Sequence, residues 1–160
     1  VYQMDFIERA VCFTGHRDIH DTDEVRTRLY TVVEELINKD YRFFLAGGAR
    51  GFDTLAAQTV LALKEKYPHI KLITVLPFKN PFEHERGWSA DDINAHMQCL
   101  RRSDRRLLLF PHYQSGCYYA RDRYMVDHAS VCVAYLRRTS GGTAYTVNYA
   151  NRMNKELSNV

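Results

Sequence analysis

The sequence lacks the features that define several broad classes of protein. Its 160 residues include four cysteines, but these are scattered without CxxC spacing, which argues against a zinc site and a disulfide scaffold. No apolar run approaches the roughly 20 residues of a membrane span, and no signal-peptide pattern opens the sequence. Internal repeats and low-complexity segments are also absent. We therefore expect a cytoplasmic globular protein with no membrane partner and no bound metal.

The sequence also lacks a large excess of charge of either sign. Lys and Arg number 22, Asp and Glu number 19, and the net charge is only +3. A DNA-binding domain would usually carry a basic stripe. This composition permits an anionic ligand and leaves nucleic acid as a possible partner that is not favoured. The P-loop pattern and a clean GxGxxG are both missing, so neither a kinase nor an NAD-dependent enzyme is indicated.

Short apolar runs alternate with amphipathic segments from residue 10 onward. Strands are expected at residues 10–13, 43–46, 70–76, 106–110 and 131–136, with a short edge strand at 157–160. Helical spacing of apolar residues between these runs predicts intervening helices. The alternation predicts an α/β fold, a Rossmann-like three-layer sandwich with a mainly parallel five- or six-stranded sheet and helices on both faces. We expect one domain over residues 1–160, with residues 1–9 as a leader strand or a loose end.

Three glycine loops, at residues 14–17, 47–53 and 140–143, follow expected strands. Ligands of open α/β sheets bind beyond the carboxyl ends of the strands, and backbone N–H groups at a helix N-terminus suit a phosphate. A tight turn without a ligand explains one such loop equally well, but three loops at one edge favour a binding site. The expected ligand- or phosphate-binding residues are Thr14, Gly15, His16, Arg17, Gly47, Gly48, Ala49, Arg50, Gly51, Asp53, Arg121, Gly141, Gly142 and Thr143.

Three residues of the second loop carry more specific expectations. Arg50 offers a fork of donors that matches a phosphate. Asp53 either reaches a ribose hydroxyl or caps the following helix. A Gly48→Asp substitution is expected to abolish ligand binding and leave the fold intact, because its carboxylate would face the phosphate.

The residues do not identify a catalytic group. The carboxylates considered for that role are Asp53, Asp127, Glu83 and Glu85. The irregular segment 78–88 is either a lid over the site or an exposed charged loop.

Three tyrosines and two histidines could have either a functional or a structural role. Tyr113, Tyr118 and Tyr119 could stack on a base, but core packing is the expected use. His96 and His128 stand alone on expected helices, and we expect both to be structural.

Several motifs resemble one superfamily when they are taken together. Residues 44–53, with the sequence FLAGGARGFD, look like the glycine motif of the SMF/DprA side of the SLOG superfamily. Residues 12–17, CFTGHR, are similar to the opening of its YpsA-like branch. Further similarity covers Leu76-Pro77-Phe78, Trp88, Tyr124-Met125-Val126-Asp127 and residues 141–150. The resemblance implies a Rossmann-like domain that binds nucleotides or nucleotide-derived ligands, and it makes a homodimer plausible.

Three functions therefore stay open. The first is binding of a nucleotide or nucleotide sugar through the glycine loops, for example as a sensor, with no other cofactor. The second is a nucleotide-processing enzyme similar to the LOG relatives, which are phosphoribohydrolases. Their catalytic Glu follows a Gly-Thr pair, whereas here Thr143 runs into Ala144-Tyr145-Thr146-Val147 without a Glu. The third is single-stranded DNA binding of the DprA kind.

Overall fold

The computed structural model describes residues 2–160, with side chains described from Asp5 onward. Six parallel strands form one sheet in the order β4-β3-β2-β1-β5-β6. The strands are β1 (Ala10–Gly15), β2 (Phe43–Ala46), β3 (Lys71–Leu76), β4 (Arg105–Leu108), β5 (Val131–Tyr135) and β6 (Glu156–Asn159). The helices are α1 (Tyr2–Glu8), α2 (Thr22–Asn38), α3 (Phe52–Lys66), the 3-10 helix η1 (Pro81–Glu83), α4 (Ala90–Arg102), α5 (Cys117–Asp127) and α6 (Gly142–Arg152).

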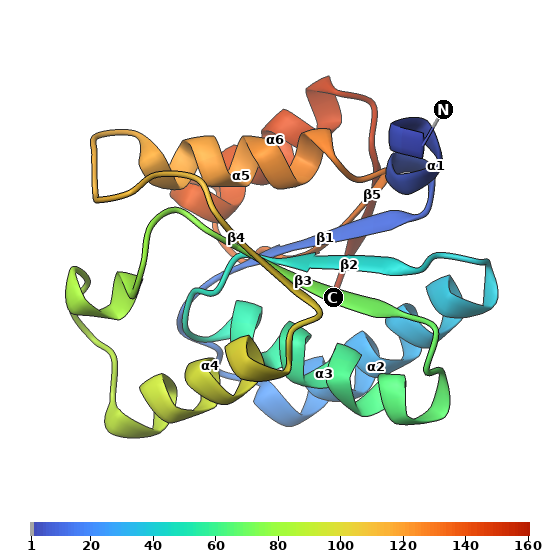
Figure 1. The fold of residues 1–160 in the computed structure, drawn as a ribbon, viewed down its shortest axis with the longest axis horizontal. Coiled ribbons are helices and arrows are strands. Elements are labelled where there is room, and N and C mark those ends of the chain that lie inside the picture. The colour runs from blue at the N-terminus through green and yellow to red at the C-terminus, as the bar shows by residue number, and fades with distance from the viewer. Residues whose placement is uncertain (1) are drawn as a thin grey trace.

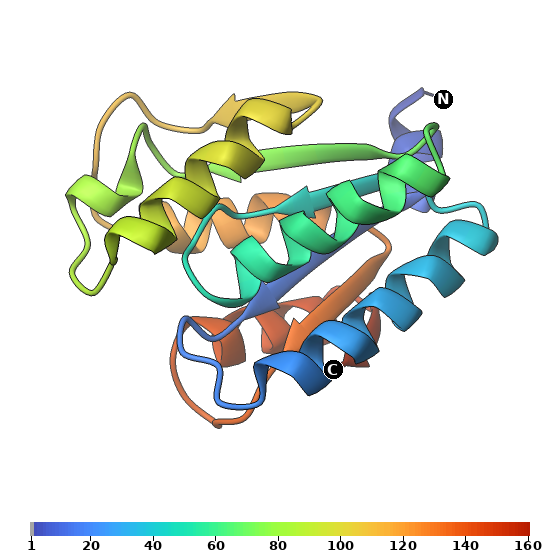
Figure 2. The same cartoon turned by 90° about the horizontal axis from the view of Figure 1, so that it is seen from below.

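Helices cover both faces of the sheet. Helices α2, α3 and α4 lie on one face, and α1, α5 and α6 lie on the other (Figures 1 and 2). This arrangement confirms the predicted α/β Rossmann-like sandwich and gives the sheet six strands.

The central strand β1 contributes to the core on both sides of the sheet, because successive side chains of a strand point to opposite faces. Val11 and Phe13 pack with Phe44 in the core that includes α2 and α3. Ala10 and Cys12 pack in the second core, which includes residues of α5 and α6. Burial on both faces explains why β1 is a nearly continuous apolar run, and this run is the signal that predicted the strand.

Three local expectations are corrected. Residues 2–8 form helix α1 rather than a leader strand or a loose end. Helix α3 begins at Phe52 and has Gly51 as its N-cap, so Asp53 lies inside the first turn and is not the cap. Tyr113 and Tyr119 are 49% and 46% exposed, so they are not core residues.

All four cysteines are buried and free. Within residues 2–160, no helix combines the length and the apolar composition that crossing a membrane requires.

The loops that follow the carboxyl ends of the strands lie together in the structure. The loops that follow β1, β2, β3 and β5 gather at one edge of the sheet (Figure 2). Strands β1 and β5 are neighbours, with Gly15 opposite Tyr135, so their two loops leave the sheet together. The expected glycine loops are therefore at the same edge.

Candidate ligand-binding cleft

A cleft of about 640 Å³ opens at this edge of the sheet. Its volume lies within the range of small-molecule sites, about 300–1,000 Å³. Most of the expected site residues line it, namely Thr14, Gly15, His16, Arg17, Ala49, Arg50, Asp53, Arg121, Gly142 and Thr143. The expected residues Gly47, Gly48, Gly51 and Gly141 are not among the lining residues.

At one end of the cleft, His16 lies against two arginines from the loop after β5. Its Nε2 accepts the backbone N–H of Arg137 at 2.8 Å, and its Nδ1 lies 3.2 Å from the guanidinium of Arg138. Burial lowers the pKa of His16, and the charges of Arg138 and Arg137 lower it further. Since Nε2 accepts a hydrogen bond, we assign the proton of the neutral ring to Nδ1. A ring N–H and a guanidinium then meet, and both are donors.

The N-terminus of α6 belongs to the same end of the cleft. Its N-cap is Gly141, and no side chain caps the helix. A Cβ added at Gly142 would meet no atom within 4 Å, so the space beside this turn is open. An uncapped helix N-terminus has unsatisfied N–H groups and a partial positive charge. Together with His16 and Arg138, it makes this end of the cleft suited to an anion.

Two backbone N–H groups of the stretch that joins β2 to α3 already have partners within the protein. The carboxylate of Asp53 accepts the N–H of Ala49 at 3.2 Å, and the N–H of Phe52 donates to the carbonyl of His16 at 3.2 Å. The Arg121 guanidinium donates to the Gly47 carbonyl and to Asp122. A protein carboxylate thus occupies the place where the sequence predicted a bound phosphate.

The glycines of this loop make close packing possible. Gly48 has φ +73°, and a Cβ there would collide with the Leu76 side chain and approach the ring of His96 at 3.1 Å. Gly51 has φ +78°, and a Cβ there would collide with the backbone of Arg17. The expectation that Gly48→Asp leaves the fold intact is therefore wrong, because the new side chain would enter the packed interior.

Asp53 is 7% exposed and sits in the wall of the cleft. Burial raises its pKa from 3.8 to about 6, although the charge of Arg121 and the hydrogen bond from Ala49 oppose the rise. Its carboxyl group therefore changes charge near neutral pH. Among the carboxylates that the sequence suggested, Asp53 and Glu85 line the cleft. Glu83 and Asp127 do not, and Asp127 instead accepts a hydrogen bond from the Tyr149 hydroxyl at 2.7 Å.

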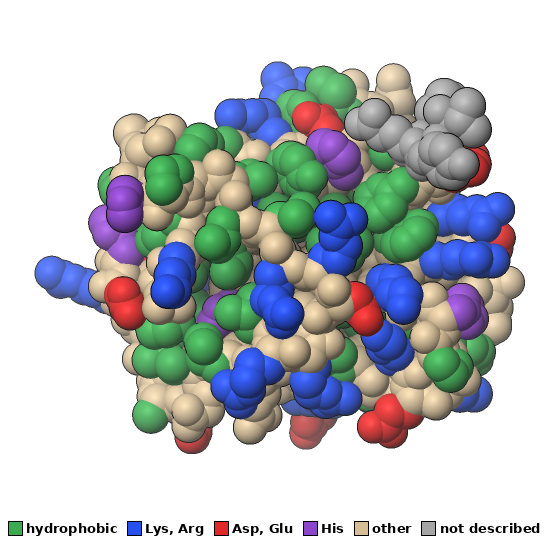
Figure 3. Space-filling model, viewed as in Figure 1, with side chains coloured by type: hydrophobic (Ala, Val, Ile, Leu, Met, Phe, Trp, Pro, Cys, Tyr) green, Lys and Arg blue, Asp and Glu red, His purple; other side chains and the backbone are tan. Residues whose placement is uncertain are grey.

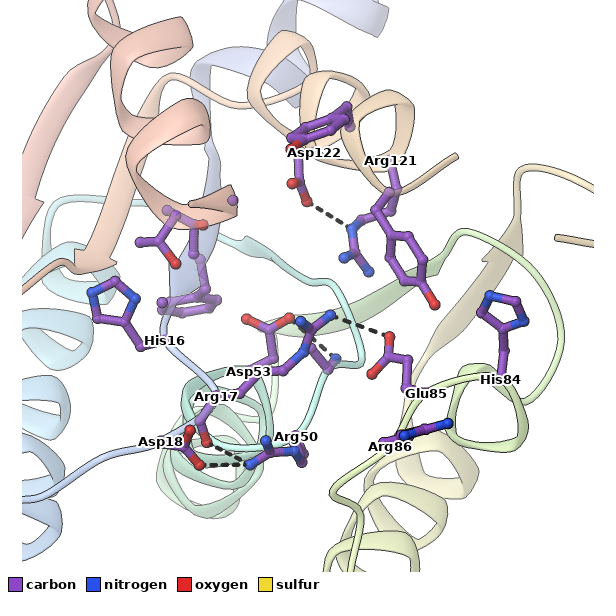
Figure 4. A pocket seen from close by; sticks show the side chains of 18 of the residues that line it. His16, Arg17, Asp18, Arg50, Asp53, His84, Glu85, Arg86, Arg121 and Asp122 are labelled. Carbon is purple, nitrogen blue, oxygen red and sulfur yellow. Dashed lines mark hydrogen bonds and ion pairs between the residues drawn. The ribbon is translucent and has the colours of Figure 1, made fainter. Parts of the chain in front are cut away.

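Ion pairs join the segment 78–88 and the loop after β2 to the loop after β1 (Figure 4). The Arg17 guanidinium lies 3.2 Å from Glu85, whose other carboxylate oxygen accepts the Trp88 indole N–H at 2.9 Å. Arg50 pairs with Asp18 at 2.8 Å and also donates to the Arg17 carbonyl. Both contacts use the Nη1 atom of Arg50, and its buried Nε has no hydrogen-bond partner among the described residues, so part of the guanidinium fork stays available.

At the other end of the cleft, two aromatic rings are stacked. The rings of His84 and Tyr113 have centroids 3.9 Å apart and an interplanar angle of 20°. Phe78 meets both rings edge-on, each at 5.8 Å. The Tyr118 hydroxyl beside them is buried and, within residues 2–160, makes no hydrogen bond of normal length. Burial raises the pKa of Tyr118, and the Glu85 carboxylate next to its hydroxyl raises it further.

Sequence reasoning missed several lining residues, including Asp18, Arg86 and Arg138. Arg138 carried a usable signal, because it stands just before the third glycine loop. The single histidines lie outside the cleft lining: His96 is buried against Phe82 and Trp88, and His128 stacks on Tyr124.

The parallel sheet and its edge cleft define a Rossmann-like α/β domain. More particularly, the chain belongs to the YspA SLOG family, whose sequence model matches residues 13–159. This match confirms the resemblance to the YpsA-like branch. The SPbeta prophage-derived protein YoqJ of Bacillus subtilis (strain 168) is 32% identical over 142 residues, which is 81% of each chain.

Solved structures of DNA processing protein A share the fold. The Helicobacter pylori protein, described by its single-stranded DNA binding mode, has a TM-score of 0.70 at 18% identity, over 99% of this chain and 67% of that one. The Streptococcus pneumoniae protein has a TM-score of 0.66 at 15% identity, over 98% of this chain and 51% of that one. The chain thus spans between half and two thirds of these neighbours, and the likeness establishes the fold alone.

Proposed function

We propose that the chain binds a nucleotide or a nucleotide-derived ligand in the cleft, with a phosphate held by the loops that follow β1 and β5. The observation that carries this proposal is the meeting of His16 and Arg138, two donors 3.2 Å apart. Within the described residues, Arg138 makes no ion pair with a carboxylate. An anion oxygen beside the two groups could accept a hydrogen bond from each of them.

The surroundings favour a phosphate over a simple halide-sized ion. The hydroxyls of Thr14 and Thr143 and the uncapped turn of α6 line the same cleft. A phosphate has several acceptor oxygens and can take hydrogen bonds from a guanidinium, hydroxyls and backbone N–H groups at once. Charge-assisted hydrogen bonds of this kind contribute about 1.5–3 kcal/mol each.

A thermal-shift screen followed by calorimetry tests the proposal. The panel is AMP, ADP, ADP-ribose, a nucleotide sugar and inorganic phosphate, because a ligand that binds only the native state raises apparent stability. We expect a nucleotide to bind the wild type and to bind Arg138→Ala at least tenfold more weakly. The matched control is Arg26→Ala, which removes an exposed arginine of α2 outside the cleft.

Each outcome bears on a separate part of the proposal. Equal affinity in Arg138→Ala would contradict the placement of the phosphate. No binding by any nucleotide would contradict the function itself. Release of a free base during the same incubation would favour the enzymatic alternative, in which Asp53 would act as a general acid.

Single-stranded DNA binding is the second candidate. Exposed Arg101, Arg102, Arg105 and Arg106 lie at the end of α4 and on the edge strand β4, away from the cleft. Figure 3 shows many Lys and Arg side chains over the part of this face where α4 and β4 lie. DNA affinity that falls steeply with salt, and that is lost in Arg105→Ala/Arg106→Ala but kept in Arg138→Ala, would support this candidate.

A further inference from the structure

We propose that the aromatic end of the cleft, formed by His84 and Tyr113, binds a planar heteroaromatic base. The ligand of the cleft is then a base-bearing nucleotide and not a sugar phosphate or a free phosphate. This inference rests on the proposed function, which places the phosphate at the opposite end.

The two rings already have the geometry of a base stack. Their centroids lie 3.9 Å apart, and their planes are within 20° of parallel. They come from different segments, since His84 follows η1 and Tyr113 lies between β4 and α5. Phe78 is 5% exposed and meets both rings edge-on, so the stack rests on a buried support.

The Tyr113 side of the stack is accessible to a ligand. Tyr113 is 49% exposed although it is part of an aromatic cluster at a cleft wall. Bases bind proteins by stacking on exposed aromatic faces, and each stacked base contributes about 1–3 kcal/mol.

A buried polar group also lies at this end. The Tyr118 hydroxyl is next to the Glu85 carboxylate, which is close enough to raise the pKa of Tyr118 but forms no hydrogen bond of normal length with it. The Tyr118 ring lies 5.9 Å from Phe78. A ring nitrogen or an exocyclic group of a stacked base would give this hydroxyl a closer partner.

The order of groups across the cleft matches the order of groups in a nucleotide. His16 lies at one side and His84 at the other, with Arg17, Asp53 and Glu85 between them (Figure 4). His16 lies on the first side, and the aromatic faces lie on the second, where Arg86 is close to His84 (Figure 4). The carboxylates between them can accept hydrogen bonds from ribose hydroxyls. One nucleotide can therefore engage both ends only with its base on the aromatic side.

Isothermal titration calorimetry with matched probes tests this inference. The base-bearing probes are AMP, GMP, CMP and UMP, and ribose 5-phosphate is the base-free probe. For the nucleotide that binds best, Tyr113→Ala should weaken affinity by about fivefold to more than a hundredfold. The same variant should bind ribose 5-phosphate as the wild type does. Tyr113→Phe keeps the ring and should retain nucleotide affinity.

The controls separate stacking from loss of structure. Tyr30→Ala removes an exposed tyrosine of α2 and should change neither affinity. If Tyr113→Ala does not fold, as judged by circular dichroism, His84→Ala provides the second test of the same stack. We expect it to weaken nucleotide binding and to leave ribose 5-phosphate binding unchanged.

The contradicting results are distinct from those for the proposed function. If the wild type binds ribose 5-phosphate as tightly as every nucleotide, the base subsite is wrong and the phosphate site stands. If Tyr113→Ala weakens both kinds of probe equally, or neither, the stack has a structural role only. If the wild type binds none of the five probes, this inference fails together with mononucleotide binding at the cleft.

Discussion

The carboxylate of Asp53 accepts the backbone N–H of Ala49 at 3.2 Å, so the glycine loop before α3 has an anion that belongs to the protein itself. A helix N-terminus of this kind ordinarily suits a bound phosphate. We therefore expect an external anion at the loop after β5, where donors of His16 and Arg138 lie 3.2 Å apart. On this proposal the two glycine loops have different roles.

The first prediction concerns the pH dependence of stability. The pKa of Asp53 is raised from 3.8 to about 6 in the folded protein, so the native state binds this proton more tightly than the unfolded state. The associated stability is present below pH 4 and is lost as the pH rises to about 6. The shift corresponds to about 3 kcal/mol of unfolding free energy. Urea denaturation measures the free energy of unfolding at each pH. Between pH 4 and pH 7 this free energy should fall by about 3 kcal/mol less in Asp53→Asn than in the wild type. The same pH dependence in both proteins would contradict the burial argument.

The second prediction replaces the expectation for Gly48. Gly48→Ala adds a Cβ at φ +73° against Leu76, which introduces both backbone strain and overpacking. We expect it to lower the free energy of unfolding by about 2–5 kcal/mol. Gly142→Ala is the matched control, because a Cβ there meets no atom within 4 Å and should change stability by less than about 1 kcal/mol. Equal stability of the two variants in urea denaturation would show that Gly48 does not pack as described.

The third prediction concerns the ion pair between Arg17 and Glu85. Glu85→Gln removes a negative charge from the cleft and releases the Arg17 guanidinium, while Gln can still accept the Trp88 indole N–H. An anionic nucleotide should bind about threefold to tenfold more tightly, since one charge interaction across a partly solvated cleft contributes on the order of 1 kcal/mol. Calorimetry at low salt measures this gain.

The control for this substitution lies two residues away. Glu83→Gln changes a carboxylate that does not line the cleft and that interacts with Asn80 at 3.3 Å. Its nucleotide affinity should stay that of the wild type. If Glu85→Gln binds no more tightly than Glu83→Gln, the ion pair does not compete with the ligand.

The sequence predicted the fold well because the signals that define it are local. The apolar runs at Phe43–Ala46 and Val131–Tyr135 are buried strands, and Ser89 forms the capping box with Asp92 that begins α4. The position of all three glycine loops at one edge followed from the parallel sheet.

The arrangement within the candidate site was less predictable. The contact between His16 and Arg138 joins two loops that are distant in the sequence, and the direction of the Asp53 side chain depends on the path of its loop. The stacking of His84 on Tyr113 depends in the same way on two irregular segments. Periodicity and spacing carry no information on such contacts, so the sequence named most of the lining residues and could not assign their roles.

A ¹H–¹⁵N NMR titration of the wild-type protein with the nucleotide that binds best shows which loop holds the phosphate. We expect the amide signals of Gly142 and Thr143 and the His16 ring signals to shift most at the phosphate end. The amides of Ala49 and Phe52 should shift less, because their N–H groups already donate to Asp53 and to the His16 carbonyl. Larger shifts at residues 49–52 than at residues 142–143 would contradict the placement of the phosphate and return it to the loop before α3.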